Sequence, residues 1–73
     1  MSVAVTNSAC DRAQQALSNS AMWVLRQLKV DQDGKDLVLT GQVSSFYHKQ
    51  MAQEIVRAAA AGVPLINRIQ VQS

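Results

Sequence analysis

Cysteine, histidine and aromatic residues are scarce in this chain of 73 residues, and each scarcity excludes a class of site. Cys10 is the only cysteine, so the chain cannot close a disulfide within itself. Cys10 and His48 are together too few for a zinc site, which takes about four ligands at characteristic spacings. We therefore expect no metal site and no cofactor, and we interpret Cys10 as a small residue in or near a helix.

Long apolar runs and a basic leader are also missing. No stretch approaches the roughly 18 or more apolar residues of a transmembrane helix. The N-terminal sequence MSVAVTNSACDRAQQ has no basic segment followed by an apolar one, so no signal peptide is visible. As it stands, the chain is expected to stay in the cytoplasm. If it is one domain of a longer exported parent, we expect it to be associated with the cell envelope.

Charge and composition indicate one small domain. The formal net charge of +2 favours anionic partners, but there is no basic tract of the kind that nucleic-acid-binding arms carry. Hydrophobic residues make up 48% of the chain and aromatic residues only 4%, so Leu, Ile, Val and Met are expected to build the core. We expect a single domain over residues 1–73, with residues 1–7 loosely attached.

Residues that resemble catalytic groups have structural explanations. His48 has no acid at a spacing that would orient it, and the pair Ser44–Ser45 lacks the glycine elbow that surrounds a serine nucleophile. The aspartates between Asp31 and Asp36 bracket a turn, but they lack the length and terminal glutamate of a calcium loop. A glycine-rich phosphate loop is also absent. The sequence therefore predicts a protein that is not an enzyme.

An amphipathic helix is predicted from Ala9 to about Asn19. Asn7 or Ser8 suits the position before the helix, because either side chain can accept a hydrogen bond from a free backbone N–H. Small apolar residues recur at helical spacing along one stripe, and polar residues occupy the remainder. The stripe consists of Ala9, Ala13, Ala16 and Leu17.

A β-hairpin is predicted from the alternating pattern over residues 21–43. In its first strand, which ends at Val30, Trp23 points to the outer side; it either packs under the first helix or lies at a binding edge. Asp33 and Gly34 form the turn, because glycine accepts the positive φ that a tight turn needs. The return strand covers residues 36–43, and Gly41 within it indicates a bulge or a close approach of the backbone or of a helix.

A second helix is predicted to begin at Ser44 or Ser45, either of which suits a cap, and to end at about Ala61. Because side chains advance about 100° per residue, one apolar face is expected to pack on the sheet. Its members are Tyr47, Met51, Ile55, Ala58 and Ala59, with Met51 and Ile55 as the main contacts. Gly62 is expected to end the helix, and Pro64 prevents its resumption.

The last segment, LINRIQVQS, is predicted as a third strand with Ile69 and Val71 inward. Asn67 also falls at an inward position of this alternation, although it is polar. A helix between the second and third strands makes them parallel if they are adjacent, with a right-handed crossover. The expected fold is α+β in the order α-β-β-α-β, with a three-stranded mixed sheet covered on one face by two helices.

Residues Leu28 to Val71 follow the pattern LxVxxxGxxLxLxGxVxSxxxKQxAQEIV and then GVxxxNxIxV, and this ordered set resembles the BON domain family (bacterial osmotic-shock and nodulation-protein domain). The positions that carry the resemblance include Gly34, Gly41, Ser45, Gly62 and Asn67. The resemblance implies a small α/β domain, usually one module of a larger bacterial envelope protein. It also implies a non-enzymatic domain that contacts phospholipid surfaces or another hydrophobic ligand.

One side of the second predicted helix is a candidate binding surface. Phe46, the only phenylalanine, lies on nearly the opposite side from the predicted core face, and Lys49, Gln53 and Arg57 follow it along the helix. An aromatic ring beside cations suits the interface of an anionic membrane. Phe46 either packs at the core edge or is exposed, and Trp23 is the second candidate anchor.

Three functions remain open, in decreasing order of preference. A lipid-binding module predicts that basic and aromatic residues project together. A protein-interaction or self-assembly module predicts that the outer strand or the alanine-rich helix pairs with another chain, including a second copy, which would supplement a thin core. Nucleic-acid binding is disfavoured, because three aromatic residues are too few to interleave with a basic stripe.

Overall fold

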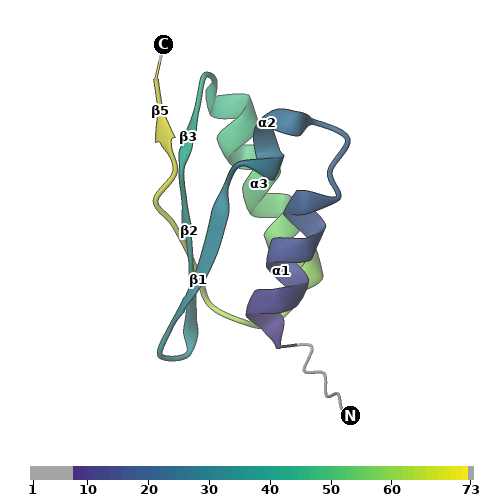
Figure 1. Ribbon diagram of the computed structural model, residues 1–73. Coiled ribbons are helices and arrows are strands. Elements are labelled where there is room, and N and C mark those ends of the chain that lie inside the picture. Colours follow the sequence, from purple (N-terminus) through teal and green to yellow (C-terminus); the bar gives the residue numbers. More distant parts are fainter. Residues whose placement is uncertain (1–7, 73) are drawn as a thin grey trace.

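The computed structural model describes residues 8–72, which form three helices and five short strands (Figure 1). The predictions for residues 1–7, including Asn7 as a cap, lie outside the described residues. In chain order, the elements are α1 (Ala9–Ser18), α2 (Trp23–Arg26), β1 (Lys29–Asp33), β2 (Asp36–Thr40), β3 (Gln42–Val43), α3 (Phe46–Ala59), β4 (Leu65–Asn67) and β5 (Gln70–Val71).

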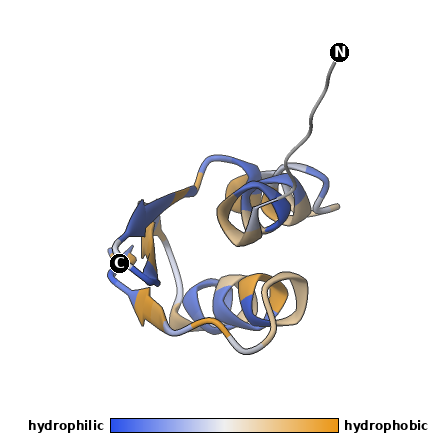
Figure 2. Ribbon diagram, turned by 90° about the horizontal axis from the view of Figure 1, so that it is seen from below, coloured by the Kyte–Doolittle hydropathy of each residue, from blue (hydrophilic) through white to orange (hydrophobic). Residues whose placement is uncertain are grey.

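The strands form a mixed sheet in the order β1-β2-β4. β1 and β2 are an antiparallel hairpin, and β4 pairs in parallel with β2 after the α3 crossover. β3 and β5 continue the second and third strands as a separate parallel pair. Figure 2 shows α1 and α3 side by side on one face of the sheet. The predicted α+β fold, with its order α-β-β-α-β and its mixed three-stranded sheet, is confirmed.

The predicted first strand is wrong before Lys29, because Trp23–Arg26 forms the short helix α2. Leu25 and Leu28 are both buried, and a three-residue spacing suits a helical turn rather than an alternating strand. Arg26 stabilises the turn from outside, since its Nε donates a hydrogen bond to the Ser20 carbonyl at 2.8 Å. The strand therefore begins five or more residues later than the alternating pattern indicated.

Two glycines lie where the hairpin changes direction. Asp33 pairs with Asp36, which leaves Gly34 and Lys35 as the turn, and Gly34 has a φ of +63°. Gly41 separates β2 from β3 and has a φ of +136°. A Cβ at Gly41 would lie 2.5 Å from Leu28 Cδ2, so the close approach predicted there is present.

The predicted core face of α3 is correct only in part. The residues that α3 buries are Ala52 and Val56, followed by Ala60 at its C-cap, whereas Met51 and Ile55 are only partly buried. Tyr47 and Ala58 are exposed. The cause is that α3 packs against α1 as well as the sheet, so small side chains occupy the contact between the two helices and the larger Met51 and Ile55 lie at its border.

Other boundaries shift by one or two residues. α3 ends at Ala59 and Ala60 is its C-cap, so Gly62 lies two residues beyond the cap. In the last strand Ile69 is buried as predicted, but Val71 is exposed. Val71 lies in β5, an outer strand that pairs only with β3, and its side chain therefore borders solvent.

The core is entirely aliphatic. Its buried members are Ala13, Leu17, Leu25, Leu28, Val30, Leu37, Leu39, Val43, Ala52, Val56, Ala60 and Ile69. These residues form one cluster, and partly buried hydrophobic side chains pack against it. The three aromatic side chains take no part in this core, so their positions need another explanation.

Candidate functional site

All three aromatic residues of the chain are exposed, and they come from two elements at one end of the molecule. The exposed fractions are 65% for Trp23, 65% for Phe46 and 63% for Tyr47. Trp23 begins α2, and Phe46 and Tyr47 begin α3; Figure 1 places both helix starts at the same end of the fold. We call these three residues the aromatic end.

Ser45 sets the start of α3, the helix that carries Phe46 and Tyr47 of the aromatic end. Its Oγ accepts a hydrogen bond from the His48 backbone N–H at 3.2 Å, which makes Ser45 the N-cap and Phe46 the first residue of α3. The same Oγ lies 3.0 Å from His48 Nδ1, so His48 is held at the start of the helix, with its ring 5.7 Å from that of Tyr47. Ser45 therefore acts as the predicted cap, while Ser44 precedes it.

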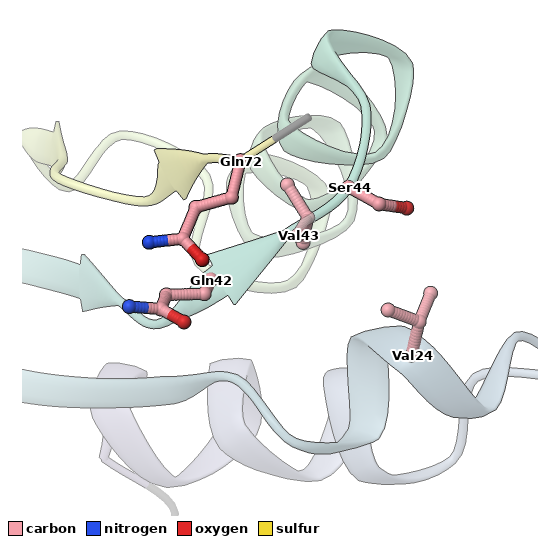
Figure 3. Close-up of a pocket in the computed structure, with 5 residues that line it drawn as sticks. All are labelled: Val24, Gln42, Val43, Ser44 and Gln72. Carbon is pink, nitrogen blue, oxygen red and sulfur yellow. The ribbon is translucent and has the colours of Figure 1, made fainter.

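A shallow hollow of about 420 Å³ opens between α2 and β3 beside the aromatic end (Figure 3). Val24 projects from α2 towards Val43 and Ser44, which links the two elements that carry the aromatic residues. Gln42 and Gln72 complete the lining, so the hollow has apolar walls and an uncharged polar rim. This surface can receive an apolar group without burying a charge.

The aromatic end carries positive charge only. Arg26 in the last turn of α2 and Lys49 in the first turns of α3 belong to segments 19–28 and 42–50, which contain no aspartate or glutamate. Three of the five acidic residues lie in the β1–β2 hairpin, whose tip is at the opposite end in Figure 1. An anionic surface would therefore meet the aromatic end with the favourable charge.

The structure divides the surface predicted on the second helix. Phe46 and Lys49 lie at the aromatic end, and Trp23 joins them from α2 rather than from a strand. Arg57 is eleven residues beyond Phe46, about 16 Å along the helix at 1.5 Å per residue, and so belongs to the other end. Gln53 lies between them and accepts a hydrogen bond from Asn67 Nδ2 at 3.0 Å.

The hydrogen bonds of Asn67 explain why a polar residue occupies this inward position. Besides Gln53, its Nδ2 donates to the Lys49 carbonyl at 3.4 Å, and its Oδ1 accepts from the Ile69 N–H at 3.0 Å. One side chain thus joins β4 to the side of α3 that carries Lys49 and Gln53. These two residues border the core and are partly buried, so they do not lie opposite it as predicted.

A contact at the other edge of the sheet was missed from the sequence. Gln14 of α1 donates from Nε2 to the Leu28 carbonyl at 3.0 Å and accepts at Oε1 from the Val30 N–H at 2.8 Å. Cys10 Sγ also contacts the Val30 carbonyl, at 3.5 Å. Burial, with the carboxylates of Asp11 and Asp31, raises the pKa of the Cys10 thiol. Sequence spacing does not reveal such contacts, because they depend on how α1 crosses β1.

Residues 8–72 contain no cluster of three or more side chains that could hold a metal ion. None of the helices in that range is long and apolar enough to cross a bilayer. The one histidine contacts Ser45, the helix cap, and residues 42–50 around it include no aspartate or glutamate. The exposed groups thus offer contact surfaces, with no assembled set of reacting groups among the described residues.

Comparison with known proteins agrees with the motifs noted above. No curated protein matches this sequence significantly. The family model described as "BON domain" matches residues 6–73, which is nearly the whole chain and includes every element of the fold. The match therefore extends the resemblance seen over Leu28 to Val71 through α1. The chain belongs to the BON domain family.

Proposed function

We propose that this domain is a non-catalytic module that binds phospholipid surfaces through its aromatic end. The observation that carries the proposal is the exposure of all three aromatic side chains beside an entirely aliphatic core. BON domains are generally associated with phospholipid binding, and this association supports the proposal. The aromatic end supplies the residues that would make the contact in this chain.

The chemistry of the aromatic end suits the interfacial layer of a bilayer. Trp23 and Tyr47 each combine an apolar ring with a polar N–H or O–H group, and such side chains favour the headgroup region, where one part is dry and the other wet. Phe46 has no polar group and would lie deeper. Arg26 and Lys49 would face anionic headgroups, and the shallow hollow beside Val24 leaves room for part of an acyl chain or glycerol group.

Co-sedimentation with vesicles tests this proposal. The wild-type protein is expected to bind vesicles that contain phosphatidylglycerol, more strongly as the anionic fraction rises. The double variant Trp23→Ser, Phe46→Ser should lose most of this binding, because it removes apolar area that is largely exposed in the free protein. Ile66→Ser is the matched control, since Ile66 is an exposed apolar residue on β4, away from the aromatic end.

The outcome separates lipid binding from other uses of the same residues. Equal binding by the wild type and the double serine variant would contradict the assignment of the site. Absence of wild-type binding at low salt would contradict lipid binding by this domain altogether. Circular dichroism and a thermal unfolding midpoint close to that of the wild type are required of every variant.

A further inference from the structure

The two outer edges of the sheet differ in how far their backbone N–H and C=O groups are already bonded. At the β1 edge, Gln14 occupies the Leu28 carbonyl and the Val30 N–H, at 3.0 and 2.8 Å, much as a neighbouring strand would. Cys10 contacts the Val30 carbonyl as well. An edge closed in this way cannot accept another strand over those residues. The start of the β1 edge, up to Val30, is therefore protected by α1.

The opposite edge is open except at the Ile69 N–H, which donates to Asn67 Oδ1. β4 is the last strand of its sheet and β5 the last of its pair, and no other strand of residues 8–72 lies outside them. Hydrogen bonds to β2 and β3 come from the backbone of Pro64, Arg68, Gln70 and Gln72. Because successive residues of a strand direct their backbone groups to opposite sides, Leu65, Asn67, Ile69 and Val71 direct theirs outward. The Ile69 N–H already donates to Asn67 Oδ1 at 3.0 Å, so an added strand would bond to the other outward groups. We call these four residues the β4–β5 edge.

Positive charge borders the β4–β5 edge on both sides. Asn67 joins the edge to the side of α3 that carries Lys49 and Gln53, and Arg57 follows one turn after Gln53. Arg68 lies within the edge segment itself and is exposed. From Leu37 to Gln72 the only acidic residue is Glu54, which is turned about 100° from Gln53 around the helix.

We propose that the β4–β5 edge binds an extended acidic segment of a partner protein by adding it to the sheet as a further strand. Main-chain hydrogen bonds to the outward N–H and C=O groups would supply affinity, as in other strand-addition complexes. Acidic side chains on the strand would face Arg57 on one side or Arg68 on the other, which gives the surface its preference. This interaction is additional to lipid binding, and the backbone groups that it uses do not belong to the aromatic end.

A second copy of the chain fits the edge poorly. Two β4–β5 edges that paired about a two-fold axis would bring Arg68 and its neighbouring cations against themselves, and like charges across paired strands are destabilising. The acidic β1 strand of another copy is also unsuitable, since Gln14 already occupies its backbone groups at Leu28 and Val30. The edge therefore suits a partner of opposite charge better than itself.

Fluorescence anisotropy with a blocked, labelled peptide of alternating glutamate and valine tests the proposal, with an alternating lysine–valine peptide as control. The acidic peptide should bind more tightly, and binding should weaken with salt. Amide shifts in ¹⁵N spectra should be concentrated at residues 64–72. Equal binding of the two peptides, no binding of the acidic one, or shifts confined to another surface would overturn the proposal.

Val71→Pro and Val71→Ala form the decisive pair of variants. Both remove the valine side chain, but only proline removes the outward N–H, a change that outer strands tolerate. The proline variant should bind the acidic peptide about tenfold more weakly than the alanine variant, as expected for one lost hydrogen bond and a steric clash. Equal affinities would overturn the proposal.

Charge reversal keeps the test available if the proline variant does not fold. Arg68→Glu should weaken peptide binding, whereas Lys35→Glu in the hairpin turn, which changes the net charge equally, should not. Equal effects of the two reversals on peptide binding would overturn the proposal. Sedimentation velocity gives a second test: a wild-type dimer that Val71→Pro abolishes would mean that a second copy occupies the edge, and this would also overturn the proposal. Vesicle binding should be equal for the two Val71 variants, and its loss in the proline variant alone would also overturn the proposal.

Discussion

The two ends of this domain present opposite surfaces. The aromatic end carries Trp23, Phe46 and Tyr47 with positive charge only, whereas the β1–β2 hairpin carries three aspartates beside Lys29 and Lys35 and no aromatic residue. Both ends are exposed, so burial does not explain the difference. In a chain with so few aromatic residues, their absence from the core and their presence at one end indicate a surface for contact.

Gly41 connects the two ends, since β2 extends towards the hairpin and β3 leads into α3. Gly41→Val should destabilise the domain by about 3 kcal/mol, because a φ of +136° and a Cβ placed 2.5 Å from Leu28 Cδ2 both oppose a side chain. Urea unfolding followed by circular dichroism measures this difference.

The hairpin supplies the control for that substitution. Gly34→Ala should cost only about 1 kcal/mol, since a Cβ at Gly34 would have no atom within 4 Å and only the positive φ is unfavourable. Equal losses at Gly34 and Gly41 would mean that backbone conformation alone matters. The close packing of β3 on Leu28 would then not be needed to position the aromatic end.

Charge reversal along α3 sharpens the comparison between the ends. Lys49→Glu should weaken binding to anionic vesicles by at least about 1 kcal/mol, roughly fivefold, because a basic residue near an anionic bilayer contributes about that much. Arg57→Glu makes the same change in net charge about 12 Å further along the helix and should have a smaller effect. Co-sedimentation at low and physiological salt measures both, and equal losses would show that net charge, rather than the aromatic end, directs binding.

The smallest expected effect is that of the Asp31 carboxylate on the pKa of the Cys10 thiol. Burial raises the pKa of the Cys10 thiol above its ordinary value of 9.0, and Asp11 and Asp31 raise it further. Asp31→Asn should therefore lower this pKa and speed alkylation by iodoacetamide at mildly alkaline pH. An unchanged pH profile of the alkylation rate would show that the hairpin charge does not reach Cys10.

The same raised pKa has a consequence for stability. The folded state holds the thiol proton more tightly than the unfolded chain does, so this contribution is fully present below the pKa of the unfolded chain. It is lost as the pH rises through the higher, folded-state value. Asp31→Asn should make the loss smaller, which unfolding measurements on either side of pH 9.0 can test.

Much of the fold could be predicted because local signals and packing agreed. The Asp33–Gly34 turn, the Ser45 cap and the alternation through Leu37 and Leu39 each specify one local conformation. The α2 segment could not be predicted in this way, because Val24, Leu28 and Val30 also fit an alternating strand. Only the simultaneous burial of Leu25 and Leu28 distinguishes the helical turn.

The candidate site was predicted in part. Phe46 and Lys49 lie together on α3, and Trp23 is exposed, but Arg57 lies far from them and Tyr47 was assigned to the core. The error at Tyr47 followed from the rotation of α3, because its buried stripe is set by contact with α1 through small alanines that carry little hydropathy signal. Side-chain contacts between distant elements, such as those of Gln14, leave no periodic signal at all.

Trp23 fluorescence in the presence of vesicles is the most direct measurement of the central claim. Trp23 is the only tryptophan and lies at the aromatic end, so its emission should shift to shorter wavelengths with phosphatidylglycerol vesicles and be quenched by brominated acyl chains. A tryptophan moved to the hairpin turn, in the variant Trp23→Phe, Lys35→Trp, should stay in water and show neither change. An unshifted emission for Trp23 on vesicle-bound protein, or an equal shift for both tryptophans, would contradict insertion by the aromatic end.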